Sequence, residues 1–154
     1  MPTHTSMLDE LRAIKKRDGI RSMLVHLNSL TEFRFTALYR FNDESLQNVF
    51  FFDRERPEVS SCPTIPIMAS YCVFVKNGKT TFKSCDSHQD ARLNGHSKQM
   101  EVRPYCGVPL VGEDGKMFGT VCHFDFRALP ISDENVSLME RIAEMLQPDV
   151  KTLS

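Results

Sequence analysis

The stretch GKMFGTVCHFDF, residues 115–126, decides the fold, because its side chains alternate between the two faces of an extended chain. The face expected to meet the core carries mostly bulky apolar side chains: Phe118, Thr120, Cys122, Phe124 and Phe126. The opposite face carries a more polar set: Met117, Val121, His123 and Asp125. Together with the apolar segment 108–111 and the Asp-Gly pair at 114–115, this stretch predicts an antiparallel β-hairpin.

The sequence allows two registers for this hairpin. A three-residue connection centred on Asp114 places Cys106 opposite Cys122, whereas a two-residue Asp114-Gly115 turn places Cys106 opposite His123. In the first register the two cysteines are candidates for a redox-switchable pair or a thiolate site. The alternative is that both are small buried side chains, which is the usual environment of a free cysteine.

Hydrophobic periodicity divides the rest of the chain into helices and strands. Apolar residues recur at helical spacing in four segments: 7–16, 20–30, 66–76, which Gly78 ends, and 133–146, which Pro148 closes. Alternation predicts three strands besides the hairpin: 33–41, 46–53 and 80–85. Consecutive hairpins favour a mostly antiparallel sheet with helices packed against it, so we expect a single α+β domain.

The composition excludes several classes of protein. The 154 residues are 41% hydrophobic and 25% charged, which is typical of one globular domain and leaves no room for a separate output domain. A net charge of −1 argues against nucleic-acid binding, and no apolar run is long enough to cross a membrane. The five cysteines form no Cys-x-x-Cys pair and no secretory signal is present, so we expect a cytoplasmic protein without disulfides or a metal site.

The polar segment 86–101 is long for a plain connection, which indicates that it covers a site. Arg92 in this segment is a candidate for pairing with an anionic ligand. Asp90 and His96 are further candidates for polar contacts, although their spacing matches no known metal site. The alternative for each of them is an ordinary solvated loop position.

Two further pairs of residues are candidates for a site. His123 and Asp125 lie two residues apart on one strand face, where a carboxylate would orient the imidazole, raise its pKa and help to bind a polar ligand. The alternative is a structural pair that ties the strand to the following loop. Tyr71 and Tyr105 would give a pocket an aromatic wall with polar tips, or would be ordinary core residues.

Three motifs resemble those of GAF domains: Ser70-Tyr71-Cys72, Tyr105-Cys106-Gly107-Val108-Pro109-Leu110, and Gly119-Thr120-Val121-Cys122-His123-Phe124-Asp125. The chain is similar, over residues 19–146, to the bacterial subgroup whose sheet ends in Gly-Thr-x-Cys-His-Phe-Asp. The resemblance implies a PAS-like fold with an antiparallel sheet of five to six strands and helices on one face. On the other face it implies a ligand pocket roofed by 66–76 and 86–101. The domain would occupy 19–148, between a helical flank at 1–18 and a tail at 149–154.

The resemblance implies a non-catalytic, small-molecule-sensing domain in signal transduction, with its ligand and any cofactor unknown. The Asn-Lys pair of cyclic-nucleotide GAF domains is absent. Bilin-binding members use a Cys-His pair on a helix or loop beside the pocket, whereas the Cys122-His123 pair lies in the last strand. The candidate pocket residues are Tyr71, Cys72, Cys85, Asp90, Arg92, His96, Tyr105, His123 and Asp125.

Two other functions stay open. Free methionine-(R)-sulfoxide reductases are stand-alone GAF proteins of similar length, and Cys72 and Cys85 lie in suitable regions for thiol chemistry, but segment 86–101 contains no cysteine. The other alternative is a protein-binding module without a ligand. Apolar stripes on the terminal helices exceed what one small sheet face needs, which favours a homodimer that passes its signal to a separate output protein.

Overall fold

The computed structural model describes residues 4–150, which form an antiparallel sheet of six strands in the order β3-β2-β1-β6-β5-β4. The strands are β1 (Phe35–Asn42), β2 (Ser45–Asp53), β3 (Ile65–Pro66), β4 (Phe82–Ser84), β5 (Tyr105–Val111) and β6 (Met117–Phe124). The predicted α+β class is confirmed, and the short strand β3, which has no alternating pattern to reveal it, is an addition to the prediction.

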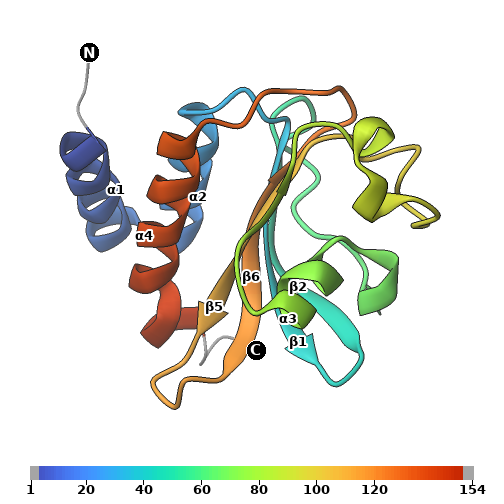
Figure 1. Ribbon diagram of the computed structural model, residues 1–154. Coiled ribbons are helices and arrows are strands. Elements are labelled where there is room, and N and C mark those ends of the chain that lie inside the picture. Colours follow the sequence, from blue (N-terminus) through green and yellow to red (C-terminus); the bar gives the residue numbers. More distant parts are fainter. Residues whose placement is uncertain (1–3, 151–154) are drawn as a thin grey trace.

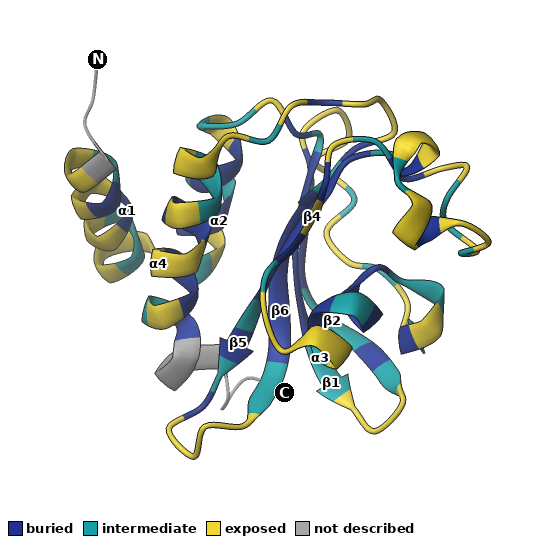
Figure 2. Ribbon diagram, in the orientation of Figure 1, coloured by how far each residue is buried: buried dark blue, intermediate teal, exposed yellow. Residues whose placement is uncertain are grey.

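Helices cover one face of the sheet and a roof of short elements covers the other (Figure 1). The helical layer consists of α1 (His4–Asp18), α2 (Ile20–Ser29) and α4 (Asp133–Val150). The roof consists of α3 (Cys72–Gly78) and three 3-10 turns: η1 (Ile67–Ala69), η2 (Ser87–Gln89) and η3 (Ala91–Leu93). Figure 2 shows the consequence for burial, with the buried strands lying between the two covers.

Because both faces of the sheet are covered, the protein has two apolar clusters. The helix-side cluster includes Leu24, Leu38, Val108, Val121 and Ile142. The roof-side cluster includes Phe35, Tyr39, Phe51, Tyr71, Tyr105 and Cys122. The expectation that only the Cys122 face of the last strand is core is therefore wrong: Val121, His123 and Asp125 are buried as well.

Two predicted helices have different bounds in the structure. The helix predicted over 66–76 is split, because Ser70 adopts an extended conformation between η1 and α3. Gly78 lies inside α3, and Lys79, at φ 54°, is the left-handed residue that ends it. Helix α4 continues through Pro148 to Val150, so the prediction that Pro148 closes this helix is wrong.

The predicted domain boundaries at 18/19 and 148/149 stay a prediction. The expected flank begins with residues 1–3 and the expected tail ends with residues 151–154, and both of these pieces lie outside the described residues. Gly19 stands at the first boundary with φ 98°, a conformation that side chains other than glycine rarely adopt. It allows the chain to turn sharply from α1 into α2.

The β5–β6 hairpin has the second of the two predicted registers. Cys106 lies opposite His123, and Gly107 lies opposite Cys122. A register shift between Leu110 and Val111 produces this pairing, with a loop longer than two residues. Cys106 then belongs to the helix-side cluster and Cys122 to the roof-side cluster, so the hypothesis of a Cys106–Cys122 redox pair is wrong.

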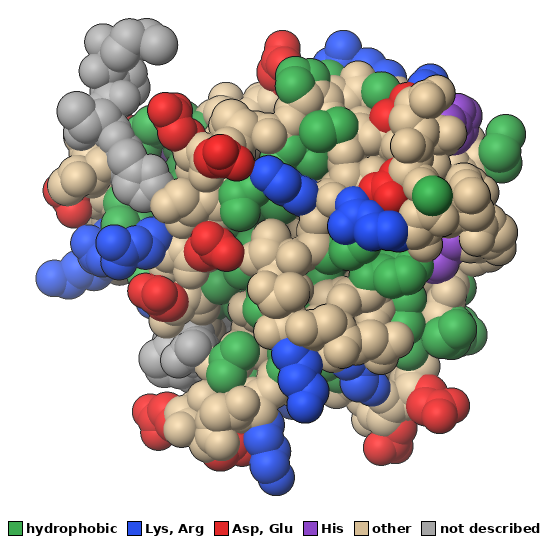
Figure 3. Space-filling model, viewed as in Figure 1, with side chains coloured by type: hydrophobic (Ala, Val, Ile, Leu, Met, Phe, Trp, Pro, Cys, Tyr) green, Lys and Arg blue, Asp and Glu red, His purple; other side chains and the backbone are tan. Residues whose placement is uncertain are grey.

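Helix α1 forms an outer layer against α2 and α4 (Figure 1). Leu8 and Leu11 on its inner face are buried within the chain itself. This part of the predicted surplus stripe is thus covered within the chain, and the homodimer stays a prediction. Acidic and basic side chains are interspersed over the face that Figure 3 shows. Within residues 4–150, every helix is too short or too polar to span a membrane.

We predict that Gly119→Ala destabilises the protein by roughly 3 kcal/mol, because overpacking at a rigid contact has few ways to relax. A Cβ atom at residue 119 would overlap the backbone carbonyl oxygen of Tyr39 on the neighbouring strand. Gly78→Ala is the matched control, since its nearest new contact is a methyl group of Thr80 at 3.7 Å. Urea unfolding of both variants measures the difference, and an equal loss in the two would contradict the prediction.

Candidate functional site

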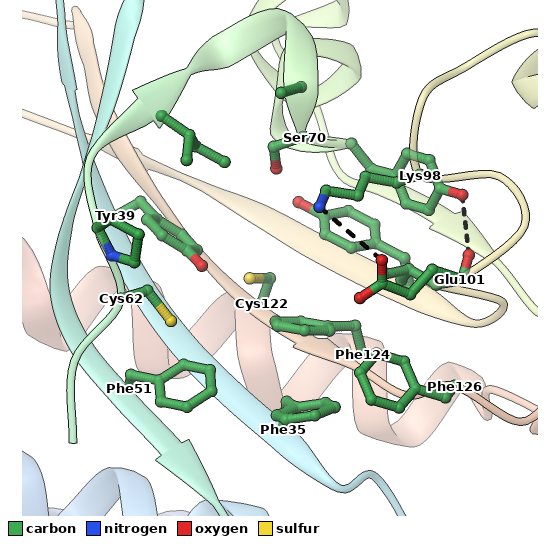
Figure 4. Close-up of a pocket in the computed structure, with 16 residues that line it drawn as sticks. Phe35, Tyr39, Phe51, Cys62, Ser70, Lys98, Glu101, Cys122, Phe124 and Phe126 are labelled. Carbon is green, nitrogen blue, oxygen red and sulfur yellow. Dashed lines mark hydrogen bonds and ion pairs between the residues drawn. The ribbon is translucent and has the colours of Figure 1, made fainter. Parts of the chain in front are cut away.

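A cavity of about 300 Å³ lies between the sheet and its roof (Figure 4). Strands β1, β2, β5 and β6 supply its floor, and η1 with the following residues Ser70 and Tyr71 supplies part of its roof. The segment 98–102 borders it. Its walls are dominated by aromatic side chains: Phe35, Tyr39, Phe51, Tyr71, Tyr105, Phe124 and Phe126.

The aromatic floor follows from strand alternation. Phe35 and Tyr39 are two alternations apart on β1, so both side chains reach the roof side of the sheet. The Phe35 ring stacks on Phe124 at a centroid distance of 4.8 Å and meets Phe126 edge-on at 5.0 Å. These contacts hold the apolar surface in place.

The Tyr39 hydroxyl is a polar group inside this apolar surface. The side chain is 8% exposed, and its oxygen points into the cavity (Figure 4). Among the described residues it has no hydrogen-bond partner, whereas the Tyr71 hydroxyl donates to the carbonyl oxygen of Val102 at 2.8 Å. Burial raises the pKa of Tyr39, so the phenol is neutral and can donate or accept a hydrogen bond.

Charged side chains meet the cavity at its rim. Lys98 and Glu101 form an ion pair at 4.0 Å, and both side chains are more than a third exposed. Ser70 also borders the cavity, but its hydroxyl accepts a hydrogen bond from the Cys72 backbone N–H at 3.1 Å. A ligand would therefore meet formal charge only where it enters.

Two thiols lie at the inner wall. Cys122 lines the cavity, and Cys72, the first residue of α3, is fully buried and does not line it. The Cys72 sulfur is 3.1 Å from the Tyr105 hydroxyl and 3.2 Å from the Thr120 hydroxyl. Burial opposes ionisation of Cys72, but hydrogen bonds from the surrounding thiol and hydroxyl groups outweigh it and lower the pKa of this thiol.

Ion pairs fasten the loop that forms the outer roof. Arg92 donates to both carboxylate oxygens of Asp90, at 2.9 and 2.6 Å, and Arg103 does the same to Asp86, at 3.0 and 2.7 Å. Asp90 also caps η3 by accepting from the Arg92 backbone N–H. The hydrogen bonds from Arg92 lower the pKa of Asp90 to about 2.

The structure brings together some of the predicted site residues. Tyr71 and Tyr105 line the cavity, and Cys72 adjoins it through its contact with the Tyr105 hydroxyl. His96 packs against the Tyr71 ring at 4.7 Å, behind the wall. The other predicted residues do not line the cavity: Cys85, Asp90, Arg92, His123 and Asp125. Cys85 is exposed, and the guanidinium of Arg92 is occupied by Asp90.

The predicted pairing of His123 with Asp125 is wrong. His123 lies on the helix side, where its Nδ1 is 2.7 Å from the Thr36 hydroxyl and its ring stacks on Phe33. Asp125 instead accepts from the backbone N–H groups of Arg34 and Phe126, at 3.0 and 2.7 Å. Without a carboxylate beside it, burial lowers the pKa of His123 to about 3 rather than raising it.

Sequence reasoning missed several residues of the site, notably Tyr39, Cys62, Lys98 and Glu101. Tyr39 had a usable signal, because it stands on the strongly apolar face of its strand. The other three lie in irregular segments whose course periodicity does not reveal. Among residues 4–150, no group of three or more His, Cys, Asp or Glu side chains is placed to hold a metal ion.

The structure thus combines an antiparallel sheet, a helical layer behind it and a roofed cavity in front. Residues 18–147 match the GAF domain family, and the chain belongs to that family. It is 26% identical over 92 residues to the cyclic di-GMP phosphodiesterase PA2567 of Pseudomonas aeruginosa, a match that covers 57% of this chain and 16% of that protein.

Solved structures share the fold at low identity. The GAF domain of a phosphoenolpyruvate-protein phosphotransferase from Coxiella burnetii superposes with a TM-score of 0.72 at 12% identity, covering 97% of this chain and 95% of that one. The free methionine-R-sulfoxide reductase of Neisseria meningitidis, in complex with its substrate, gives 0.73 at 14% identity, covering 94% and 86%.

We predict that Asp90→Asn removes part of the loss of stability in acid. The pKa of Asp90 is about 2 in the folded protein, against about 4 when unfolded, so its carboxylate stabilises the fold above pH 4 and ceases to do so as the pH falls to 2. This change should amount to roughly 1–2 kcal/mol. Urea unfolding between pH 5 and 2 would measure it.

The control for this prediction is Asp9→Asn, which removes an exposed carboxylate paired with Arg12 on α1. Its pH profile should follow the wild type, since exposed ion pairs contribute little. The prediction fails if Asp90→Asn also keeps the full wild-type slope.

Proposed function

We propose that this chain is a non-catalytic sensory domain that binds a small, largely apolar molecule of one or two rings carrying one polar group. The observation that carries the proposal is the roughly 300 Å³ aromatic cavity with the unpaired Tyr39 hydroxyl directed into it. Ligand sites are typically concave and mostly apolar, with a few polar groups that fix the orientation of the ligand.

The wall chemistry supports this class of ligand. Flat rings would pack against Phe35, Phe51 and Phe124 in stacked or edge-on arrangements, which aromatic pairs prefer. The polar group of the ligand would exchange a hydrogen bond with Tyr39. Leaving that hydroxyl without a partner in an occupied, dry cavity would cost free energy, so the site favours molecules that satisfy it.

The same walls argue against a nucleotide ligand. Phosphates require several cationic or N–H donors, and among the lining residues Lys98 supplies a single cation that already pairs with Glu101. The activity of the Pseudomonas relative belongs to that protein, of which this chain spans only 16%. We therefore do not extend cyclic di-GMP chemistry to this cavity.

We predict that a thermal-shift screen of one- and two-ring aromatic compounds, each bearing one hydroxyl, carbonyl or ring N–H, finds compounds that raise the melting temperature. Ala69→Phe should abolish the shift by filling the cavity, whereas Met68→Phe, at an exposed neighbouring position, should preserve it. Tyr39→Phe should weaken binding about three- to tenfold, the worth of one hydrogen bond. A screen without hits, or hits that are unaffected by Ala69→Phe, would contradict the proposal.

A second candidate is a thiol-dependent reductase, which the lowered pKa of Cys72 beside a ligand-sized cavity favours. The fold that this chain shares with the Neisseria reductase is compatible with a reductase, but a shared fold does not by itself establish that activity. Against it, Cys72 is fully buried and does not line the cavity, and segment 86–101 has no thiol.

We predict no turnover when the purified protein is incubated with free methionine-(R)-sulfoxide and a thiol reductant. The assay follows methionine formation by chromatography. Turnover that disappears in Cys72→Ser but survives in Cys85→Ser, which changes an exposed thiol, would replace the sensory proposal with the reductase.

A further inference from the structure

We propose that Gly107 is a positioning residue that sets the size of the cavity, and with it the size of the ligand. Because residue 107 has no side chain, the Tyr105 ring can lie over strand β5 and leave the cavity open. The part that concerns the ligand rests on the function proposed above, whereas the size of the cavity can be measured without any ligand.

The register of the sheet places small residues between two rows of larger ones. On the roof side, residues of β5, β6 and β1 that lie opposite one another form rows across the sheet. The middle row consists of Gly107, Cys122 and Ala37. The rows on either side are Tyr105, Phe124 and Phe35, and Pro109, Thr120 and Tyr39. The floor is therefore lowest along the middle row, where Cys122 borders the cavity.

Gly107 is also the place where the Tyr105 ring rests. The two residues are separated by one alternation on β5, so both face the roof. A Cβ atom at residue 107 would overlap the Tyr105 hydroxyl and would lie 2.7 Å from the ring carbons Cε1 and Cζ. The ring thus fills the space that any side chain at residue 107 would need.

The neighbours of Tyr105 determine where a displaced ring could go. Its hydroxyl is 3.1 Å from the Cys72 sulfur, the Tyr71 ring meets it edge-on at a centroid distance of 5.5 Å, and the Phe82 ring lies at 6.2 Å. All three neighbours are buried, and close-packed side chains leave little space for another ring. Among the described residues, the side of Tyr105 that stays open is the one facing the cavity.

The size of the cavity makes this position important for a ligand. Ligand pockets commonly measure about 300 to 1,000 Å³, so this cavity, at about 300 Å³, has little volume to spare. A tyrosine ring moved into it would take the place of one ring of the ligand. Gly107 therefore admits two-ring molecules, and a larger residue at this position should restrict the site to one-ring molecules.

The first test is a pair of crystal structures, of the wild type and of Gly107→Ala. We expect the Tyr105 ring of the variant to turn into the cavity, the cavity to shrink, and the contact between its hydroxyl and Cys72 to be lost. Gly78→Ala is the matched control and should leave Tyr105 in place, since its new methyl group contacts only Thr80. An unchanged Tyr105 ring and cavity in Gly107→Ala would overturn the proposal.

The second test compares two probes, 2-naphthol and phenol, by isothermal titration calorimetry. Gly107→Ala should weaken the binding of 2-naphthol roughly tenfold or more, as expected for overpacking, and that of phenol by less than about threefold. Equal weakening of both probes would indicate a merely structural effect and overturn the proposal. If neither probe binds the wild type, the proposed function is contradicted, while the crystal structures still decide the role of Gly107.

A double variant shows whether the effect passes through Tyr105. Leucine is too short to reach over residue 107, so in a Tyr105→Leu background the change Gly107→Ala should alter neither the urea midpoint nor the affinity for 2-naphthol. Such coupling between two residues in contact is what a double-mutant cycle measures. If Gly107→Ala alone fails to fold, a folded double variant supports the same clash. An undiminished effect of Gly107→Ala beside leucine would contradict it.

Discussion

The close approach of strands β1 and β6 is the constraint on which the rest of the structure depends. Gly119 lies against the backbone of Tyr39, where a Cβ atom has no space. These two strands stand at the centre of the sheet and supply residues to both apolar clusters. The register that the glycine permits therefore sets which side chains face the helices and which face the cavity.

The two faces of this sheet differ in their polar chemistry. On the helix side, the buried polar groups Asn28, Thr36 and His123 are joined by short hydrogen bonds that tie α2 to the two central strands. On the roof side, the aromatic floor leaves the Tyr39 hydroxyl unpaired among the described residues. The first arrangement suits a permanent contact, because hydrogen bonds join its buried polar groups, with only the Nε2 of His123 left without a partner among these three described residues. The second suits a surface that is completed by another molecule.

Periodicity in the sequence was enough to predict the fold class, the four long strands and the terminal helices, since each buries a regular face. It could not place the cavity, because the helix-like spacing after Pro66 conceals an extended break at Ser70. Tyr71 and Tyr105 were predicted in the site because both carry an aromatic body and a polar tip. His123 and Asp125 were paired wrongly, since spacing along a strand does not show which neighbouring strand or loop supplies a nearer partner, here Thr36 and the Arg34 backbone.

The burial of both faces of β6 has a mechanical consequence. Val121 packs among the helices and Cys122 borders the cavity, and one peptide bond joins them. A displacement of the β6 backbone on the cavity side also moves Val121 and strains its packing against the helical layer. Close-packed protein interiors have low compressibility and transmit strain. Strand β6 therefore couples the cavity to the helical layer.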